Sequence, residues 1–172
     1  TSAGAGAQTI LVQGLDADYK AVEATVSMNG ATPVVTTQTF IRINHANIVT
    51  AGATGWNEGD ITVSLNSNVQ ATIEAVGGQS HDSHYAVPAG CTLCVPEVEV
   101  FGGKDFEAEI PLVFRQFGGP WQSPGHFDTY RNTVDVKLFG GLQILEKGDI
   151  KMQAIASGAG AAVYTYMIAI LR

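Results

Sequence analysis

The residues best suited to chemistry are three histidines, and the chemistry that they suit is metal binding. His81 and His84 lie three residues apart with Asp82 between them, and His126 follows much later in the chain. Two nearby histidines, a carboxylate and a distant histidine can hold a transition metal inside a small β-barrel. Side chains three residues apart on a strand point to opposite faces, so His81 and His84 converge only in a turn. We therefore expect neither a metal nor another cofactor, and keep the three histidines as weak candidates.

Two carboxylates on one strand are the next candidates. Glu107 and Glu109 share a face of an alternating segment, at a separation of about 7 Å. Such a separation suits the carboxylate pair of a glycoside hydrolase. Their face is the polar side of the strand, so we expect solvated side chains there. The chain also has no Gly-x-Ser-x-Gly motif, phosphate loop or dinucleotide fingerprint, and we expect that it is not an enzyme.

Four acidic residues in turn regions raise the question of calcium. Asp16 with Asp18, and Glu58 with Asp60, have oxygen ligands to offer, but neither pair lies in an EF-hand loop or a nonapeptide repeat. Carboxylates in turns usually accept hydrogen bonds from nearby backbone N–H groups. We expect this structural role for all four.

The two cysteines, Cys91 and Cys94, form a Cys-x-x-Cys pair. A zinc site needs two further ligands, and a redox pair usually opens a helix. Here the pair runs into Val95 and Pro96, which is typical of a strand, and residues three apart on a strand are poorly placed for a disulfide. We expect two reduced, partly buried thiols.

Both tryptophans lie near glycines, in segments without a strand pattern. A tryptophan in a loop can plug the end of a β-sandwich, anchor a protein interface or stack on a sugar. As interface residues we favour Trp56 and Trp121, together with Phe127 and Tyr130. Sugar stacking by Trp56 or Trp121 stays open.

The composition disfavours several classes of partner. The chain has 172 residues, of which 45% are hydrophobic and 15% are charged, and its formal net charge is −7. It contains no run of Lys and Arg, so we expect neither nucleic acid nor a membrane surface as a partner. No segment approaches the roughly 20 apolar residues of a spanning helix, and we expect no signal peptide. The low charge favours a protein that is packed in an assembly.

The elements that position these residues have the period of β-strands. From Phe106 to Phe114 every second residue is apolar, which is typical of a half-buried strand. The alternation recurs along the chain between Gly-Gly pairs at 77–78, 102–103, 118–119 and 140–141. We predict an all-β fold, an antiparallel and jelly-roll-like β-sandwich of about eight to ten strands with a single core. Residues 1–8, rich in Gly and Ala, form a flexible or partner-bound arm, and the sandwich domain spans 9–172.

Three segments carry more specific predictions. Asn29-Gly30 favours a type I′ hairpin with a return strand over 33–39, since both central residues of that turn need positive φ. Pro96 predicts an edge strand or a bulge over 91–101, because proline cannot donate to a strand ladder. The segment 163–171 is apolar on both faces, which predicts a central strand of the sandwich or a strand covered by a partner subunit.

Short turn and strand motifs carry a resemblance to a known family. They are Leu-Val-Gln-Gly-Leu-Asp-Ala-Asp-Tyr at 11–19, Asn-Gly at 29–30, Phe-Ile-Arg-Ile-Asn at 40–44, Gly-Asp-Ile at 59–61, Tyr-Ala-Val-Pro-Ala-Gly at 85–90, Arg-Gln-Phe-Gly-Gly at 115–119 and Leu-Glu-Lys-Gly-Asp-Ile at 145–150. In these motifs the chain resembles the small all-β virion structural proteins of marine tailed phages and large algal viruses. The resemblance implies a capsid decoration or fibre module without catalytic residues. The segments His81–His84 and Cys91–Cys94 depart from the pattern.

These expectations describe a virion structural protein of bacteriophage type, a decoration, cement or head-fibre component that acts through protein–protein contacts. Its expected location is the virion. Its expected partners are copies of itself, as a homo-oligomer with a trimer favoured, and the major capsid protein or other virion proteins. We expect removal of residues 1–8 to weaken assembly. The alternatives are a carbohydrate-binding β-sandwich module and, second, a metal-dependent cupin-like enzyme that uses the three histidines.

Overall fold

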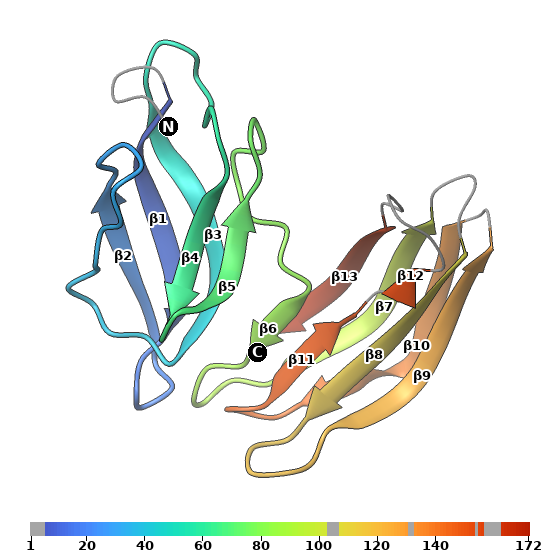
Figure 1. Ribbon diagram of the computed structural model, residues 1–172. Helices are drawn as coiled ribbons and strands as arrows, with labels where there is room; N and C mark the ends of the chain where they lie inside the picture. Colours follow the sequence, from blue (N-terminus) through green and yellow to red (C-terminus); the bar gives the residue numbers. More distant parts are fainter. Residues whose placement is uncertain (1–5, 103–106, 131–132, 154, 157–162) are drawn as a thin grey trace. The chain divides into compact units, whose positions relative to one another are not determined.

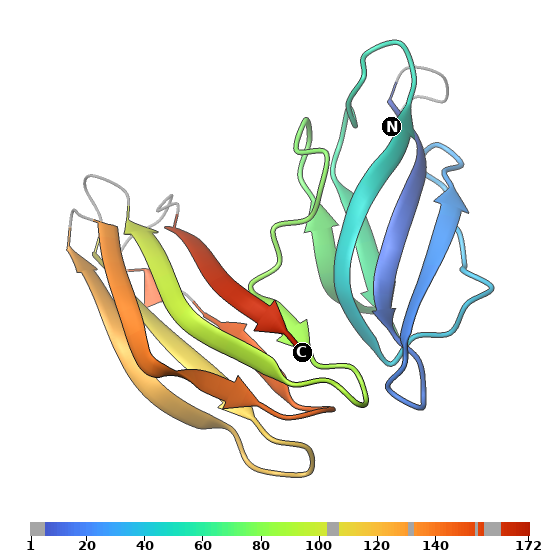
Figure 2. The same cartoon turned by 180° about the vertical axis from the view of Figure 1, so that it is seen from behind.

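The computed structural model describes every residue except 1–5, 103–106, 131–132, 154 and 157–162. The described residues form thirteen β-strands and no helix (Figures 1 and 2). All the strand pairs among them are antiparallel, so the prediction of an all-β antiparallel fold is confirmed. The strands outnumber the prediction, and their order does not confirm jelly-roll connectivity.

The chain divides into two compact units, Thr1–Asp82 and Ser83–Arg172. Each unit has a hydrophobic core of its own, whereas the length of the chain favoured one core. The apolar residues of the strands are therefore shared between two smaller cores, each enclosed by strands that are neighbours in sequence.

The first unit packs a three-stranded sheet against a hairpin. The sheet has the order β2-β1-β3, and the hairpin pairs β4 with β5. The strands are β1 (Ala7–Leu15), β2 (Ala21–Ser27), β3 (Arg42–Ala51), β4 (Ile61–Leu65) and β5 (Asn68–Ile73). Alternate residues point inward as predicted, and Val26, Ile43, Ile61 and Ile73 are buried in the core between them.

The first strand begins before the predicted end of the N-terminal arm. Ala7 pairs with Ala51 of β3, and the Gln8 carbonyl accepts a hydrogen bond from the Met28 N–H at 2.8 Å. Ala7 and Gln8 therefore belong to the sheet of the first unit. Residues 1–5 of the predicted arm lie outside the described residues.

The type I′ hairpin occurs at a different place from the predicted one. Asn66 and Ser67, between β4 and β5, both have positive φ, 50° and 66°, as this turn requires. At 29–30 the chain does turn tightly, with the Thr32 N–H donating to the Asn29 carbonyl at 3.0 Å. Residues 33–39 then form no strand, and β2 pairs with β1 instead. The predicted return strand is therefore wrong, because the turn connects to a loop.

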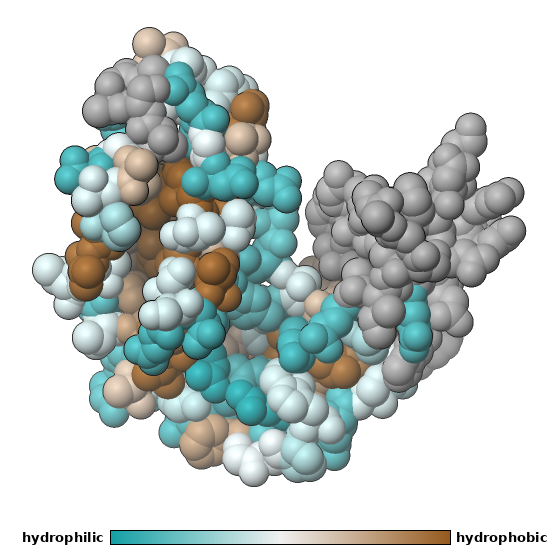
Figure 3. Space-filling model, in the orientation of Figure 1, coloured by the Kyte–Doolittle hydropathy of each residue, from teal (hydrophilic) through white to brown (hydrophobic). Residues whose placement is uncertain are grey.

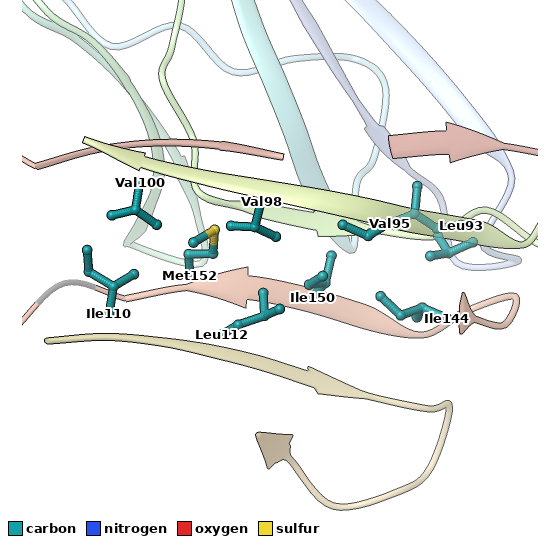
Figure 4. Close-up of a cluster of buried hydrophobic side chains, with 10 residues drawn as sticks. Leu93, Val95, Val98, Val100, Ile110, Leu112, Ile144, Ile150 and Met152 are labelled. Carbon is teal, nitrogen blue, oxygen red and sulfur yellow. The ribbon is translucent and has the colours of Figure 1, made fainter. Parts of the chain in front are cut away.

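The second unit is a β-sandwich. One sheet has the order β10-β7-β13, and the other has the order β12-β8-β11-β6 with β9 paired to β8. The strands are β6 (His84–Ala86), β7 (Leu93–Gly102), β8 (Glu107–Arg115), β9 (Gln122–Tyr130), β10 (Thr133–Ile144), β11 (Asp149–Met152), β12 (Ile155–Ala156) and β13 (Val163–Leu171). Val98 and Val100 of β7 face Ile110 of β8 and Met152 of β11 across the core (Figure 4). Burial of each such side chain stabilises the sandwich by about 2 kcal/mol.

Strand β7 is central in its sheet despite its proline. It pairs with β10 on one side and with β13 on the other. Both ladders change register opposite Pro96, between Lys137 and Leu142 of β10 and between Ile168 and Ile170 of β13. The proline therefore lies where neither ladder needs its missing N–H. The predicted bulge is confirmed, and the predicted edge position is wrong.

Strand β13 is the edge strand of this sheet. Among the described residues it pairs only with β7. Ile168, Ile170 and Leu171 are 47%, 47% and 44% exposed. The prediction that this strand is central to the sandwich is therefore wrong. The other possibility that its sequence indicates is cover by a partner subunit.

Candidate interaction site

The turn between β8 and β9 places Trp121 beside two cations. Arg115 ends β8, Trp121 directly precedes β9, and Lys151 lies on β11, the neighbour of β8. The guanidinium carbon of Arg115 is 4.7 Å from the centre of the indole ring, and Nζ of Lys151 is 4.6 Å from it. Cations at such distances are attracted to the face of the ring. They hold the indole in place although it is 43% exposed.

An ion pair fixes Arg115 in turn. Asp149 lies opposite Arg115 in the ladder of β8 and β11. Its Oδ2 accepts a hydrogen bond from Nε of Arg115 at 2.7 Å and lies 2.5 Å from Nη2. The Asp149 carboxylate is largely buried, so water screens the pair less than at an open surface. Asp149 therefore balances the charge of Arg115, and Lys151 supplies net positive charge beside Trp121.

Side-chain hydrogen bonds tie this turn to the turn between β10 and β11. The Gln116 carboxamide accepts from the Leu145 N–H at 2.9 Å and donates to the Gln143 carbonyl at 3.1 Å. In the second turn, Nζ of Lys147 lies 5.5 Å from the centre of the Phe117 ring. The two turns and Lys151 of β11 together form what we call the aromatic–basic surface: Phe117, Trp121, Leu145, Lys147 and Lys151.

Trp56 belongs to the first unit, in the loop before β4. The next residue, Asn57, is fully buried. Its Nδ2 donates to the carbonyls of Gly59 at 3.1 Å and Glu74 at 2.6 Å, and its Oδ1 accepts from the Gly78 N–H at 3.3 Å. A buried amide with these partners fixes the loop. Trp56 is 53% exposed. Because its loop is already ordered, Trp56 can contact a partner without a further loss of backbone freedom.

The other two predicted interface residues lie on β9. Phe127 is opposite Ile110 and Tyr130 is opposite Glu107 in the ladder with β8, but their side chains lie outside the described residues. Phe117 was missed by sequence analysis, and it is more exposed than either tryptophan. The signal that identifies it is the glycine pair that follows, because Gly118 has a φ of 71° and turns the chain there.

The histidines do not form a cluster in the described structure. His84 in β6 is opposite Lys151 of β11, and His126 in β9 is opposite Pro111 of β8. Because β8 and β11 separate these two strands, the two backbone positions are about 14 Å apart at roughly 4.8 Å per strand. His81 belongs to the first unit. No three His, Cys, Asp or Glu side chains of the described residues are grouped so that they could hold a metal ion.

Two of the four acidic residues of the turns, Asp16 and Asp60, have the structural role that was predicted. Oδ1 of Asp16 accepts hydrogen bonds from the N–H groups of Asp18 and Lys20, both at 2.9 Å. Oδ1 of Asp60 accepts from the Ala75 N–H at 2.9 Å. These bonds close the turns in which the carboxylates lie.

The glutamate pair of β8 is only partly described. Glu109 is exposed, as expected for the polar face of the strand, and it is opposite Asp128 of β9. The side chain of Glu107 lies outside the described residues.

Both cysteines are free and partly buried, as predicted. Cys91 lies in a turn, where its N–H donates to the Pro88 carbonyl at 3.2 Å, and Cys94 lies in β7. Burial raises the pKa of the Tyr85 phenol above its usual value, and the nearby Cys91 raises it further. The phenol is therefore neutral at neutral pH.

One serine–histidine pair was not identified from the sequence. Oγ of Ser80 lies 3.3 Å from Nδ1 of His45 and accepts a hydrogen bond from the Ala46 N–H at 2.9 Å. Ser80 is buried, and its own N–H donates to the Ala46 carbonyl at 2.7 Å. A nucleophilic serine must be accessible to a substrate, so this pair has the geometry of a structural clamp on β3. The 35-residue separation hides it from local sequence patterns.

None of the described residues belongs to a helix of the length and hydropathy that crossing a membrane requires. Comparison of the chain with protein-family models, with curated proteins and with solved structures gives no match.

Proposed function

We propose that the protein is a structural component of a virus particle, a capsid decoration, cement or head-fibre protein that acts through contacts with other proteins. The observation that carries the proposal is the exposure of large apolar side chains in both units. They are Val34, Val35, Val49, Trp56, Val69 and Val76 of the first unit, and Phe117, Trp121, Leu145, Ile168, Ile170 and Leu171 of the second. Figure 3 shows hydrophobic residues at the surface of the first unit.

The exposed aromatic residues favour binding to a protein surface because they are held in place before binding. The buried Asn57 fixes the loop of Trp56, and Gln116 ties together the two turns that carry Phe117 and Leu145. Side chains that are already ordered lose little conformational entropy on association. Exposed aromatic anchors of this kind dominate the energy of many protein interfaces.

The resemblance of the chain to small all-β virion proteins supports the same proposal. The partners that we propose are further copies of the chain and the major capsid protein or another virion protein. A charged fraction of only 15% suits a surface that is largely covered in an assembly. In this role the protein works by adhesion, and no reaction is assigned to it.

Two measurements test this function. Virus particles whose genome encodes the chain are purified, and the protein is sought in them with an antibody and by mass spectrometry. The purified protein is then added to particles that lack it, with Trp56→Ala/Trp121→Ala as the comparison. We expect the wild-type protein in the particles, and weaker rebinding of the double variant. Absence of the protein from purified particles would overturn the proposal.

A carbohydrate-binding module is a second candidate, and the accessible indole of Trp56 favours it. Sugars stack on an aromatic face that is open, whereas the ring of Trp121 is already contacted by Arg115 and Lys151. A glycan array distinguishes the two candidates. A signal that Trp56→Ala abolishes and Trp121→Ala leaves unchanged supports sugar binding.

A further inference from the structure

We propose that β13 is a docking strand for a second copy of the chain, and that two copies join their β13 edges in antiparallel fashion about a two-fold axis at Ala169. The result is a continuous sheet of six strands, in the order β10-β7-β13 followed by β13-β7-β10 of the second copy. This inference deepens the proposed function, on which it rests, by assigning one of the contacts between copies.

Strand β13 lacks the features by which edge strands avoid association. Monomeric proteins protect exposed edges with charged residues, prolines or bulges. Among the described residues, β2, β3, β9 and β10 also pair on one side only, and each contains at least one charged residue. The other strands of this kind, β4, β5, β6 and β12, contain none but are only two to six residues long, and short edges are themselves protected. The nine residues of β13 include no charged residue, no proline and no glycine. Where its ladder with β7 is interrupted, the extra residue lies on β7, so β13 itself remains regular.

Backbone N–H and C=O groups on the free side of β13 point outward. Arg172 exchanges two hydrogen bonds with Thr92, at 2.8 and 3.0 Å, and Leu171 is opposite Leu93. In an antiparallel ladder, bonded and non-bonded pairs alternate. The N–H and C=O groups of Leu171 therefore point away from β7. Those of Ala169, two residues earlier on the same strand, point away from β7 as well. These outward groups are the ones that a further strand needs.

Strand β13 is also complementary to itself. An axis at Ala169 places this small residue opposite its own copy, where the two residues exchange two hydrogen bonds. It then pairs Ile168 with Ile170 of the second copy on one face, and Met167 with Leu171 of the second copy on the other. Pairs of β-branched and aliphatic residues across two strands are stabilising. The contact covers the three exposed hydrophobic side chains of β13 without burying a charge.

The distribution of charge favours β13 over the charged strands as the contact between two copies. The first unit has seven acidic and two basic residues, a net charge of −5, and the second has nine and seven, a net charge of −2. Copies of an acidic chain repel one another in general, so contact between copies is favoured at the strand that carries no charge. The axis is two-fold, so this contact builds dimers or pairs of larger groups, in place of the trimer favoured from the sequence.

Sedimentation velocity at micromolar concentration tests the surface. We expect the wild-type chain to sediment with twice its mass of 18.0 kDa and Ala169→Lys to sediment as a monomer, because the variant places two ammonium groups at the axis. Ala169 is exposed, so the substitution is compatible with the folded unit, which circular dichroism checks. The matched control is Val35→Lys, which adds the same charge at a 91% exposed valine and leaves the dimer intact.

Cross-linking tests the register. Residues opposite each other in a bonded antiparallel pair have Cα atoms about 5.5 Å apart, which is within reach of a disulfide. Under mild oxidation we expect Ala169→Cys to form a reducible dimer and Val35→Cys to form none. A wild-type monomer, an oligomer that Ala169→Lys leaves intact, or the absence of an Ala169→Cys cross-link would each overturn this inference. None of these results bears on whether the protein is present in virus particles, so the proposed function is judged separately by its own test.

Discussion

At the scale of single residues, the surroundings of Trp121 decide how its ring can be used. Arg115 and Lys151 both contact the ring, and Asp149 forms an ion pair with Arg115. An approaching carboxylate therefore meets the ammonium group of Lys151 beside an apolar ring edge. This combination suits a protein surface that carries an acidic residue next to an apolar one. It is less suited to a sugar, which needs an open ring face.

The ion pair behind Trp121 gives a first prediction. We expect Asp149→Asn to lower the free energy of unfolding of the second unit by about 1–2 kcal/mol, because the substitution removes the charge from a largely buried, hydrogen-bonded pair. Urea unfolding at neutral pH measures the loss.

The chain contains a matched control for this prediction. Asp18 and Lys20 form an ion pair at 3.7 Å in which both side chains are open to solvent. Exposed pairs contribute little to stability, so Asp18→Asn is expected to have no measurable effect. Equal effects of Asp149→Asn and Asp18→Asn would show that burial of the Arg115–Asp149 pair has no energetic consequence.

At the scale of elements, Gly141 shows how one position in β10 depends on a neighbouring strand. Its φ is 73°, and a Cβ at this position would lie 2.6 Å from Sγ of Cys94 in β7. We therefore expect Gly141→Ala to destabilise the second unit through two effects, backbone strain of about 1 kcal/mol and a clash with the thiol. Urea unfolding of the purified variants measures both.

Gly118→Ala separates these two effects. Gly118 has a similar φ of 71°, but no heavy atom lies within 4 Å of the position of its Cβ. For Gly118→Ala we therefore expect the free energy of unfolding to fall by the backbone strain alone. In a Cys94→Ala background the thiol is absent, so Gly141→Ala should lower the free energy of unfolding by less than it does in the wild-type chain. The difference between the two backgrounds is the contribution of the clash. If Gly118→Ala and Gly141→Ala lower the free energy of unfolding equally, the contact with Cys94 has no effect on stability.

The same elements show how far the sequence predicts this fold. A strand with regular alternation, β8, was predicted near its observed position because period-two patterns are local. Pairing partners were not predictable, since β2 pairs backward with β1 although its turn at Asn29-Gly30 favoured a forward hairpin. The same limit applies to β13. Its sequence, apolar on both faces, indicated a central strand or one covered by a partner subunit, but only the pairing with β7 alone shows that it is an edge.

The site was predictable to a similar degree. Trp56 and Trp121 were identified because glycine-rich segments near a tryptophan indicate a loop. The cations beside Trp121 were not, since Lys151 reaches the ring through the pairing of β11 with β8. The two cores were missed for a related reason. A strand pattern shows which face is buried, but not which other strands cover it.

At the scale of the whole molecule, the two cores raise the question of cooperative unfolding. Ile73 is fully buried in the core of the first unit, and Ile150 is fully buried in the core of the second. Truncation of a buried isoleucine to alanine typically costs about 2–5 kcal/mol. If each core stabilises its own unit, Ile73→Ala weakens the first unit and Ile150→Ala weakens the second.

The two tryptophans make this prediction measurable, because the chain has one in each unit. In a Trp121→Phe background the fluorescence reports on Trp56 and the first unit, and in a Trp56→Phe background it reports on Trp121 and the second. We expect Ile73→Ala to lower the urea midpoint reported by Trp56 and to leave the one reported by Trp121 unchanged, with the reverse result for Ile150→Ala. Each core variant is compared with its own background, so the effect of the tryptophan substitution cancels. Equal shifts at both reporters would mean that the two cores unfold as one cooperative unit, and the chain would then behave as a single domain.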